Sequence, residues 1–218
     1  MTGLIPNRFL FDFEFPLAYL SNAPALDGRL RGWSDRARVP ALWEIEGRRG
    51  FAAIWAGWNA TGLFFGCRVS GKRRRPEGDA KRYWESDGLR VCVNMRPAPN
   101  LRRATRFCRQ LFFLPRGGGR GAAACGSAPF QRARESAPDV DPGDLHVAAS
   151  VDADGYALEG SVACRALPGF DPVEHPRIGF FVIVEDSELG QQFLTVGDDL
   201  LWYVDPSTWA TARLSRED

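Results

Sequence analysis

Cysteine and histidine are among the residues of this chain that could bind a metal ion or act as nucleophiles. There are two histidines and five cysteines: His146, His175, Cys67, Cys92, Cys108, Cys125 and Cys164. No two cysteines form a C-x-x-C pair, and the two histidines lie far apart and are not spaced with any cysteine as ligands usually are. Four of the cysteines fall in strand-like segments, where a thiol behaves as a small apolar group. We therefore predict reduced, structural cysteines, no metal site and no cofactor.

Two pairs of adjacent carboxylates, Glu185-Asp186 and Asp198-Asp199, could supply a general acid and a general base. Neighbours in a strand point to opposite faces, so solvated turn acids account better for both pairs. No G-x-S-x-G, Walker, dinucleotide-binding or H-E-x-x-H motif is present. Two histidines outside any motif do not define a Ser-His-Asp constellation. We predict a protein that is not an enzyme and has no catalytic residues.

Charge is unevenly distributed along the chain, although the net charge is only +1. Residues 29–134 hold 23 basic and 7 acidic residues, and residues 135–218 hold 4 basic and 17 acidic ones. The basic run 72–75 and a glycine-rich segment, 115–121, could contact phosphate groups. In a sandwich of interleaved strands, however, basic strands can face acidic ones, so we do not expect nucleic acid as the partner and read segment 115–121 as a loop.

Apolar residues alternate with polar ones along most of the sequence, which is typical of β-strands. The alternating phenylalanines of residues 9–15 predict one strand, and two hairpins are expected, at residues 51–69 and 145–162. Further strands are predicted at residues 89–95, 107–114, 178–184, 192–196 and 209–214, and one helical turn at 164–167. About ten short strands with almost no helical periodicity predict an all-β, antiparallel β-sandwich with a two-sheet, jelly-roll or immunoglobulin-like architecture.

Length and composition indicate a single domain over residues 1–218. No apolar run approaches the roughly 18 residues of a membrane span. The first twenty residues contain Asp12 and Glu14 and no small-residue cleavage site, so we predict no secretory signal. The expected location is the cytoplasm, without membrane association.

Several segments, in order, resemble the family 9 carbohydrate-binding modules and the wider DOMON-like group of β-sandwich domains. Residues 25–33 are similar to the opening phrase of that family, with Asp27-Gly28 followed by Trp33. Residues 58–69 resemble its hairpin and residues 84–94 its "W-x-x-D" strand, and the closing strands are matched by residues 155–159, 178–186 and 202–209. Each motif is weak alone, and their shared order carries the resemblance.

The resemblance implies a carbohydrate-binding function in which two tryptophans sandwich a terminal sugar, here Trp84 and Trp202, with Tyr203 beside them. An indole suits this role because it packs against the apolar C–H face of a pyranose. At the polar rim, Gln110 matches a ligand-contacting residue, whereas Arg90 stands in place of a glutamate, Phe112 in place of an arginine and Leu200 in place of an asparagine. This departure implies weak or altered binding.

Asp87 is also a candidate. It either reaches the ligand or, as we favour, ties down the loop of Trp84 by accepting backbone N–H bonds. The candidate ligand-binding residues are therefore Trp84, Trp202, Tyr203, Asp87, Arg90 and Gln110, and the expected partner is a glycan or another small polar ligand.

Two alternatives remain open from the sequence. The DOMON-like relatives include haem-binding electron-transfer domains, for which Met95, His146 or His175 would be the axial ligands. The second alternative is an intracellular scaffold or interaction domain whose basic face recruits a protein partner.

Overall fold

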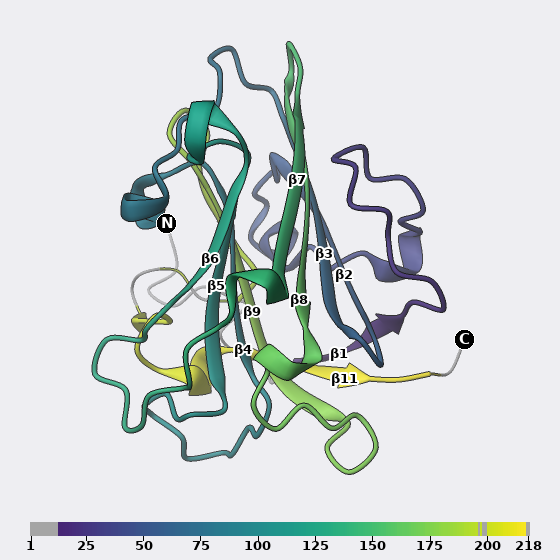
Figure 1. The fold of residues 1–218 in the computed structure, drawn as a ribbon, viewed down its shortest axis with the longest axis vertical. Helices are drawn as coiled ribbons and strands as arrows, with labels where there is room; N and C mark the ends of the chain where they lie inside the picture. Colours follow the sequence, from purple (N-terminus) through teal and green to yellow (C-terminus); the bar gives the residue numbers. More distant parts are fainter. Residues whose placement is uncertain (1–12, 196, 198–199, 217–218) are drawn as a thin grey trace.

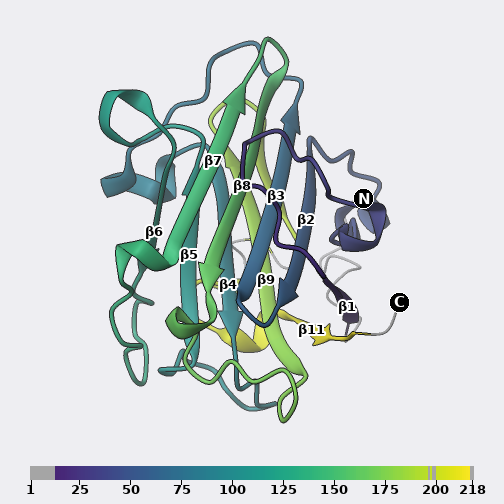
Figure 2. The ribbon, with the colours of Figure 1, turned by 45° about the vertical axis from the view of Figure 1, so that its right-hand side comes forward.

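The computed structural model describes residues 13–195, 197 and 200–216. In this part of the chain, eleven strands form two sheets that pack face to face and share β1 (Figure 1, Figure 2). Sheet A has the order β6-β5-β4-β9-β11-β1, with β10 also paired to β9, and sheet B has the order β1-β2-β3-β8-β7. The predicted all-β sandwich is confirmed.

The strands of sheet A are β1 (Glu14–Tyr19), β4 (Gly88–Asn94), β5 (Cys108–Leu114), β6 (Ala124–Ala128), β9 (Arg177–Asp186), β10 (Gly190–Phe193) and β11 (Ala210–Leu214). Sheet B adds β2 (Ala52–Asn59), β3 (Gly62–Ser70), β7 (Leu145–Val151) and β8 (Gly155–Ala163). The helical turns are η2 (Asp35–Ala37), η3 (Leu42–Glu46), η4 (Ala80–Glu85), η5 (Gly119–Gly121), η6 (Pro142–Asp144), η7 (Cys164–Ala166) and η9 (Pro206–Thr208). None of the described helices is long and apolar enough to span a membrane.

Most predicted strands appear within a few residues of their expected places. β6 was not predicted, because its small side chains give no strand signal. The strand expected at residues 9–15 is described only in part, because residues 9–12 lie outside the described residues. β1 also corrects the expectation of a wholly antiparallel sandwich. It pairs in parallel with β11 along residues 14–17 and with β2 at residues 18–19.

The main core lies between the two sheets. Alternate residues of each strand point into it, and aromatic rings join the sheets: Phe65 of β3 lies 5.5 Å from Phe113 of β5 and 6.5 Å from Phe180 of β9, centroid to centroid. Cys67 is fully buried there, and burial raises the pKa of its thiol to about 12, as expected of an inert core residue.

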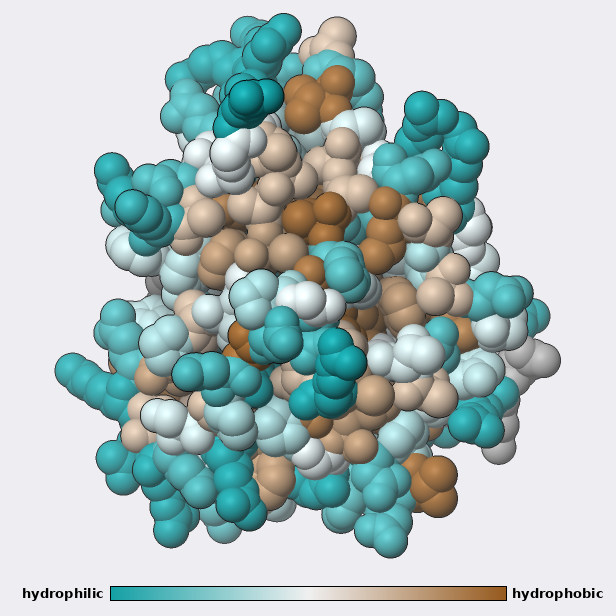
Figure 3. Space-filling model, viewed as in Figure 1, coloured by the Kyte–Doolittle hydropathy of each residue, from teal (hydrophilic) through white to brown (hydrophobic). Residues whose placement is uncertain are grey.

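A second apolar cluster covers the outer face of sheet A, the face that points away from sheet B. Its buried members are Cys92, Ala104, Cys108, Phe181, Ile183, Trp202 and Trp209. On the side of the molecule shown in Figure 3, apolar side chains gather in the middle, where β6 and β7 run, and hydrophilic ones surround them. Loop residues such as Ala104 and Trp202 cover part of the outer face of sheet A, and the candidate site lies on that face beside Trp202.

Candidate functional site

A hollow of about 580 Å³ opens on the outer face of sheet A. It is lined by Tyr83, Trp84, Arg90, Gln110, Ala128, Pro129, Gln131, Glu185, Gln191, Trp202 and Tyr203. Five of the six candidate residues from the sequence therefore lie in one place, and Asp87 does not. The volume is within the range of about 300–1,000 Å³ that is usual for small-molecule sites.

Strand register brings the polar side chains together. Cys92 of β4 pairs with Gln110 of β5, and Glu185 of β9 pairs with Gln191 of β10. Arg90 lies two residues before Cys92, so it points to the same face as Gln110 and Glu185. Neighbouring strands thus place one arginine, one glutamate and two glutamines around the hollow.

Arg90 and Glu185 form the charged part of the site. The Arg90 guanidinium makes an ion pair with the Glu185 carboxylate, whose other oxygen accepts a 2.7 Å hydrogen bond from the Gln191 amide. The Arg90 guanidinium also lies 5.1 Å from the ring centroid of Trp202. Its Nε is buried and has no hydrogen-bond partner in the structure. A buried N–H without a partner carries a desolvation cost that no hydrogen bond offsets.

The turn η4 carries the aromatic wall. Its N-cap, Asp79, accepts a 2.8 Å hydrogen bond from the backbone N–H of Lys81. At the other end of the turn, the Ser86 hydroxyl donates a 3.1 Å hydrogen bond to the carbonyl oxygen of Arg82. The ring of Tyr83 stacks on Phe112 of β5, with centroids 4.7 Å apart and planes 11° apart. Phe112, which stands where the resemblance expected an arginine, therefore anchors this turn.

Tyr83 holds Trp84 at the rim of the hollow. Its phenol oxygen accepts a 3.1 Å hydrogen bond from the Gln110 amide, and burial raises the pKa of the phenol, so the group stays neutral. The indole of Trp84 meets the Tyr83 ring edge to face, with centroids 5.3 Å apart, and is 49% exposed. Trp84 thus offers an open aromatic surface to a ligand.

Trp202 does not offer such a surface. It is only 1% exposed, and its ring stacks on Phe181 at a centroid distance of 4.7 Å. Tyr203, which is half-buried, meets it edge to face at 5.6 Å. The expected clamp of two open indoles is therefore not formed, because Trp202 fills the second apolar cluster and lies under Arg90. It forms the floor of the hollow, and Tyr203 forms part of its wall.

Asp87 is a structural residue. It is fully buried, and its carboxylate accepts hydrogen bonds from the backbone N–H of Glu77 (3.0 Å) and of Ser187 (2.6 Å) and from the Lys72 ammonium (3.0 Å). The alternative that Asp87 reaches the ligand is therefore wrong, and the role of tying down the loop before Trp84 is the one observed.

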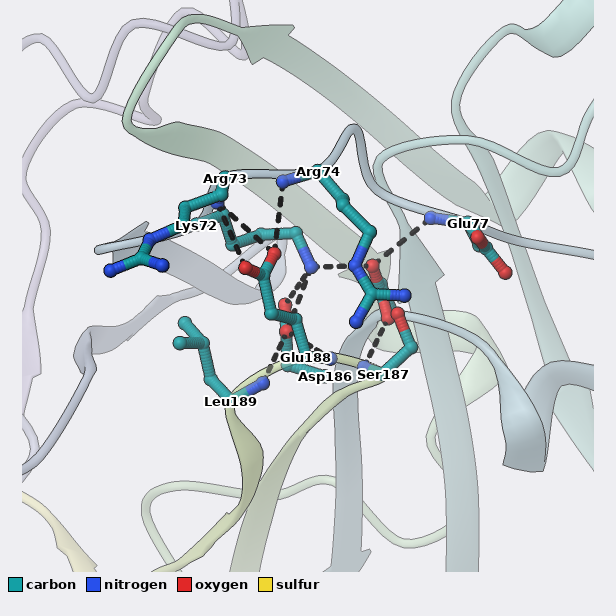
Figure 4. A network of polar contacts seen from close by, with 9 residues as sticks. Lys72, Arg73, Arg74, Glu77, Asp186, Ser187, Glu188 and Leu189 are labelled. Atoms are coloured by element: carbon teal, nitrogen blue, oxygen red, sulfur yellow. Dashed lines mark hydrogen bonds and ion pairs between the residues drawn. The ribbon is translucent and has the colours of Figure 1, made fainter.

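Lys72 is the cation at the centre of this network (Figure 4). Its ammonium also lies 2.7 and 2.8 Å from the two carboxylate oxygens of Asp186, which in turn accepts hydrogen bonds from the N–H groups of Glu188 and Leu189. Burial alone would lower the pKa of Lys72. The hydrogen bonds to Asp186 and Asp87 outweigh that effect, so its pKa lies above the usual 10.5. The network joins the start of β4, the end of β9 and the loop that leads to η4.

Six lining residues of the hollow were not among the predicted site residues: Tyr83, Ala128, Pro129, Gln131, Glu185 and Gln191. Tyr83 adjoins Trp84, and Glu185 belonged to a carboxylate pair that was correctly predicted to point to opposite faces. Glu185 faces the hollow, whereas Asp186 is buried with Lys72 and is not the solvated acid expected. The pair Asp198-Asp199 lies outside the described residues.

Nothing in the described residues favours a haem or metal site. Met95 is buried in the main core, and His146 and His175 are exposed. No cluster of three or more metal-ligating side chains occurs in the part of the chain that the structure covers.

Comparison with solved structures places this fold among carbohydrate-binding modules. A family 9 carbohydrate-binding module from Caldicellulosiruptor kristjanssonii in complex with cellotriose is 13% identical, with a TM-score of 0.61, and the match covers 94% of this chain and 95% of that chain. The glucose complex of a family 9 module from the same organism is 12% identical, with a TM-score of 0.62, over 94% and 97% of the two chains. The resemblance to family 9 carbohydrate-binding modules is thus confirmed at the level of the fold, and the resemblance to the wider DOMON-like group stays a prediction. No protein-family model and no curated protein sequence matches this chain.

Proposed function

We propose that this protein is a non-catalytic module that binds a neutral saccharide in the hollow on the outer face of sheet A. The observation that carries the proposal is the exposed indole of Trp84 beside a polar rim of Arg90, Gln110, Glu185 and Gln191. The fold supports it, because both neighbouring modules were solved with a sugar bound.

The chemistry of the hollow matches the two sides of a sugar ring. The C–H face of a pyranose packs on an aromatic ring, for which Trp84 is available. Its hydroxyls need donors and acceptors, which the Arg90 guanidinium, the Glu185 carboxylate and the amides of Gln110 and Gln191 supply. We assign Trp84 as a single stacking platform, with Tyr203 as a further aromatic residue of the lining, in place of a two-tryptophan sandwich.

A neutral ligand follows from the charge balance. Among the lining residues, Arg90 and Glu185 are the charged ones, and they form an ion pair with each other. The hollow therefore carries no net charge to select an acidic or a basic sugar.

Calorimetric titration with glucose, cellotriose and a panel of neutral oligosaccharides tests the proposal. We expect saturable binding to at least one sugar at millimolar concentration, and we expect Trp84→Ala to weaken it about tenfold or more, equivalent to about 1.4 kcal/mol. Trp55→Ala is the matched control, since Trp55 is a partly exposed tryptophan of β2 that does not line the hollow.

The variant Glu185→Gln tests the contribution of the polar rim separately from that of the Trp84 stacking platform. It keeps the shape of the side chain and removes its charge, so we expect weaker sugar binding with Trp84 unchanged. Absence of heat with every sugar, or equal losses for Trp84→Ala and Trp55→Ala, would remove the proposal.

A further inference from the structure

A second hollow, of about 750 Å³, lies beyond the other end of η4, between the loop of residues 71–79 and the β5–β6 connection. Its lining consists of Arg74, Arg75, Pro76, Glu77, Gly78, Asp79, Arg116, Gly117, Gly118 and Gly121. Both segments stood out in the sequence as a basic run and a glycine-rich stretch, and the sugar-binding hollow uses neither.

The three arginines of this hollow are not neutralised by neighbouring acids. No carboxylate among the residues that the structure describes lies within 4 Å of the guanidinium of Arg74, Arg75 or Arg116. By contrast, the paired arginines include Arg68, which contacts Asp152 at 2.7 Å, and Arg177, which contacts Glu14 at 2.8 Å. Three arginines that form no ion pair with the described residues therefore surround one concave surface, and the Glu188 carboxylate interacts electrostatically with one of them, Arg74.

Two acids also line the hollow and reduce its positive charge. Asp79 is engaged in capping η4 through the N–H of Lys81, and the Glu77 carboxylate forms no ion pair with the described residues. The exposed side chains of Arg73 and Arg120, in the same two loops, add positive charge at the rim. The balance around the hollow is therefore positive.

Backbone contacts fix the loops that carry these arginines. The Glu188 carboxylate accepts hydrogen bonds from the N–H groups of Arg73 (3.0 Å) and Arg74 (2.9 Å), next to the Lys72 network (Figure 4). These bonds engage only backbone N–H groups of the basic run, so the Arg74 guanidinium remains available to a ligand.

Glycines bring the two loops into direct contact. A Cβ on Gly78 would lie 2.2 Å from the carbonyl oxygen of Arg116, and one on Gly121 would lie 2.7 Å from the Arg116 guanidinium. Side chains at these positions would push the loops apart or displace Arg116. The arginines are thus mounted on a closely packed backbone, which lowers the entropic cost of ordering them around a ligand.

We propose that this hollow binds a compact oxyanion, namely a phosphate or sulfate group. Guanidinium groups match the oxygens of such anions with paired, charge-assisted hydrogen bonds, and glycine-rich backbone allows the anion to approach closely. The site is separate from the neutral saccharide hollow, so each can be tested without the other.

Amide NMR spectra of the ¹⁵N-labelled protein test the proposal, with inorganic phosphate, pyrophosphate and sulfate added in separate titrations at constant ionic strength. We expect saturable shifts of the Gly117, Gly118 and Gly121 signals. A parallel titration with glycerol phosphate distinguishes the source of the group: tighter binding than inorganic phosphate indicates an ester ligand, and weaker binding indicates a free anion.

The variants Arg74→Gln and Arg116→Gln should each weaken pyrophosphate binding about tenfold. The matched control is Arg29→Gln, because Arg29 is exposed and does not line this hollow. No saturation at millimolar pyrophosphate, an equal effect of the control, or binding confined to long polyanions such as heparin would overturn the proposal.

Discussion

Lys72 shows how one residue can organise a binding face without touching it. Its ammonium is buried between the carboxylates of Asp87 and Asp186, and those carboxylates hold the backbone on both sides of the saccharide hollow. Two buried carboxylates left without their cation would be strongly destabilising, because desolvated charges need a partner.

We predict that Lys72→Met lowers the free energy of unfolding by about 3–5 kcal/mol. Urea denaturation followed by tryptophan fluorescence measures it. Lys81→Met is the matched control, since Lys81 is exposed, and it should change stability by no more than about 0.5 kcal/mol. Equal stabilities of the two variants would contradict the assigned role.

The same residue predicts a pH dependence. The folded pKa of Lys72 is raised, so its contribution to stability is complete below about pH 10.5, the usual value, and is lost as the pH rises through the folded pKa. The stability difference between the wild type and Lys72→Met should therefore be constant near neutral pH and shrink in alkaline solution. Denaturation curves recorded in parallel on both proteins measure it, and a difference that grows with pH would be the opposite result.

At the level of elements, Gly160 of β8 allows a close contact between the two sheets. A Cβ at this position would lie 2.4 Å from a ring carbon of Phe113 in β5, on the opposite sheet. No small movement relieves that contact, because Phe113 is fully buried among core side chains.

We predict that Gly160→Ala destabilises the protein by about 1–3 kcal/mol through overpacking. Gly119→Ala is the control, because a Cβ there meets nothing within 4 Å. Thermal unfolding of the two variants should give a lower midpoint for Gly160→Ala alone. A similar midpoint for both would mean that the sheets can separate at low cost.

Local patterns predicted the elements better than they predicted the site. Alternation identified β2, β3, β4 and β9, whose β-branched and aromatic residues carry a strong strand signal. β6 was not predicted because Ala, Gly and Ser carry no strand signal, and it forms by pairing with β5. The resemblance to family 9 modules suggested Trp84, Arg90 and Gln110 as site residues, and in the structure all three line one hollow from adjoining elements.

The errors in the site came from tertiary packing. Whether Trp202 opens to solvent depends on the distant Phe181 and Arg90, which cover it. Asp87 has the structural role that we favoured, but its partners Lys72, from the preceding loop, and Ser187, beyond β9, were not predicted. No local pattern encodes such contacts.

For the whole molecule, the interleaving of the two halves of the chain brings their opposite charges together in space. Basic residues before residue 135 pair with acids after it, as in Lys72–Asp186, Arg68–Asp152, Arg90–Glu185, Arg102–Asp205 and Arg106–Glu135. The expected facing of basic and acidic strands is therefore observed, and the hollow of Arg74, Arg75 and Arg116 is where this compensation is missing.

We predict that residues 1–218 unfold as one cooperative unit, because strands of both halves contribute to both sheets and share one core. Urea transitions recorded by far-ultraviolet circular dichroism and by tryptophan fluorescence should coincide. A saccharide that binds the folded state should shift both curves together. Separate transitions for the two signals would indicate two independent units.

The parallel pairing of β1 and β11 has a mechanical consequence. The chain enters β1 at Glu14 and leaves β11 at Leu214, which are opposite ends of a pair of strands running in the same direction. A pulling force applied through the flanking segments would slide the two strands along each other, so their hydrogen bonds would bear the load together instead of breaking one after another. β2 pairs in parallel with the far end of β1, at Ala18 and Tyr19. Stretched between its two ends, the protein should yield abruptly and at high force.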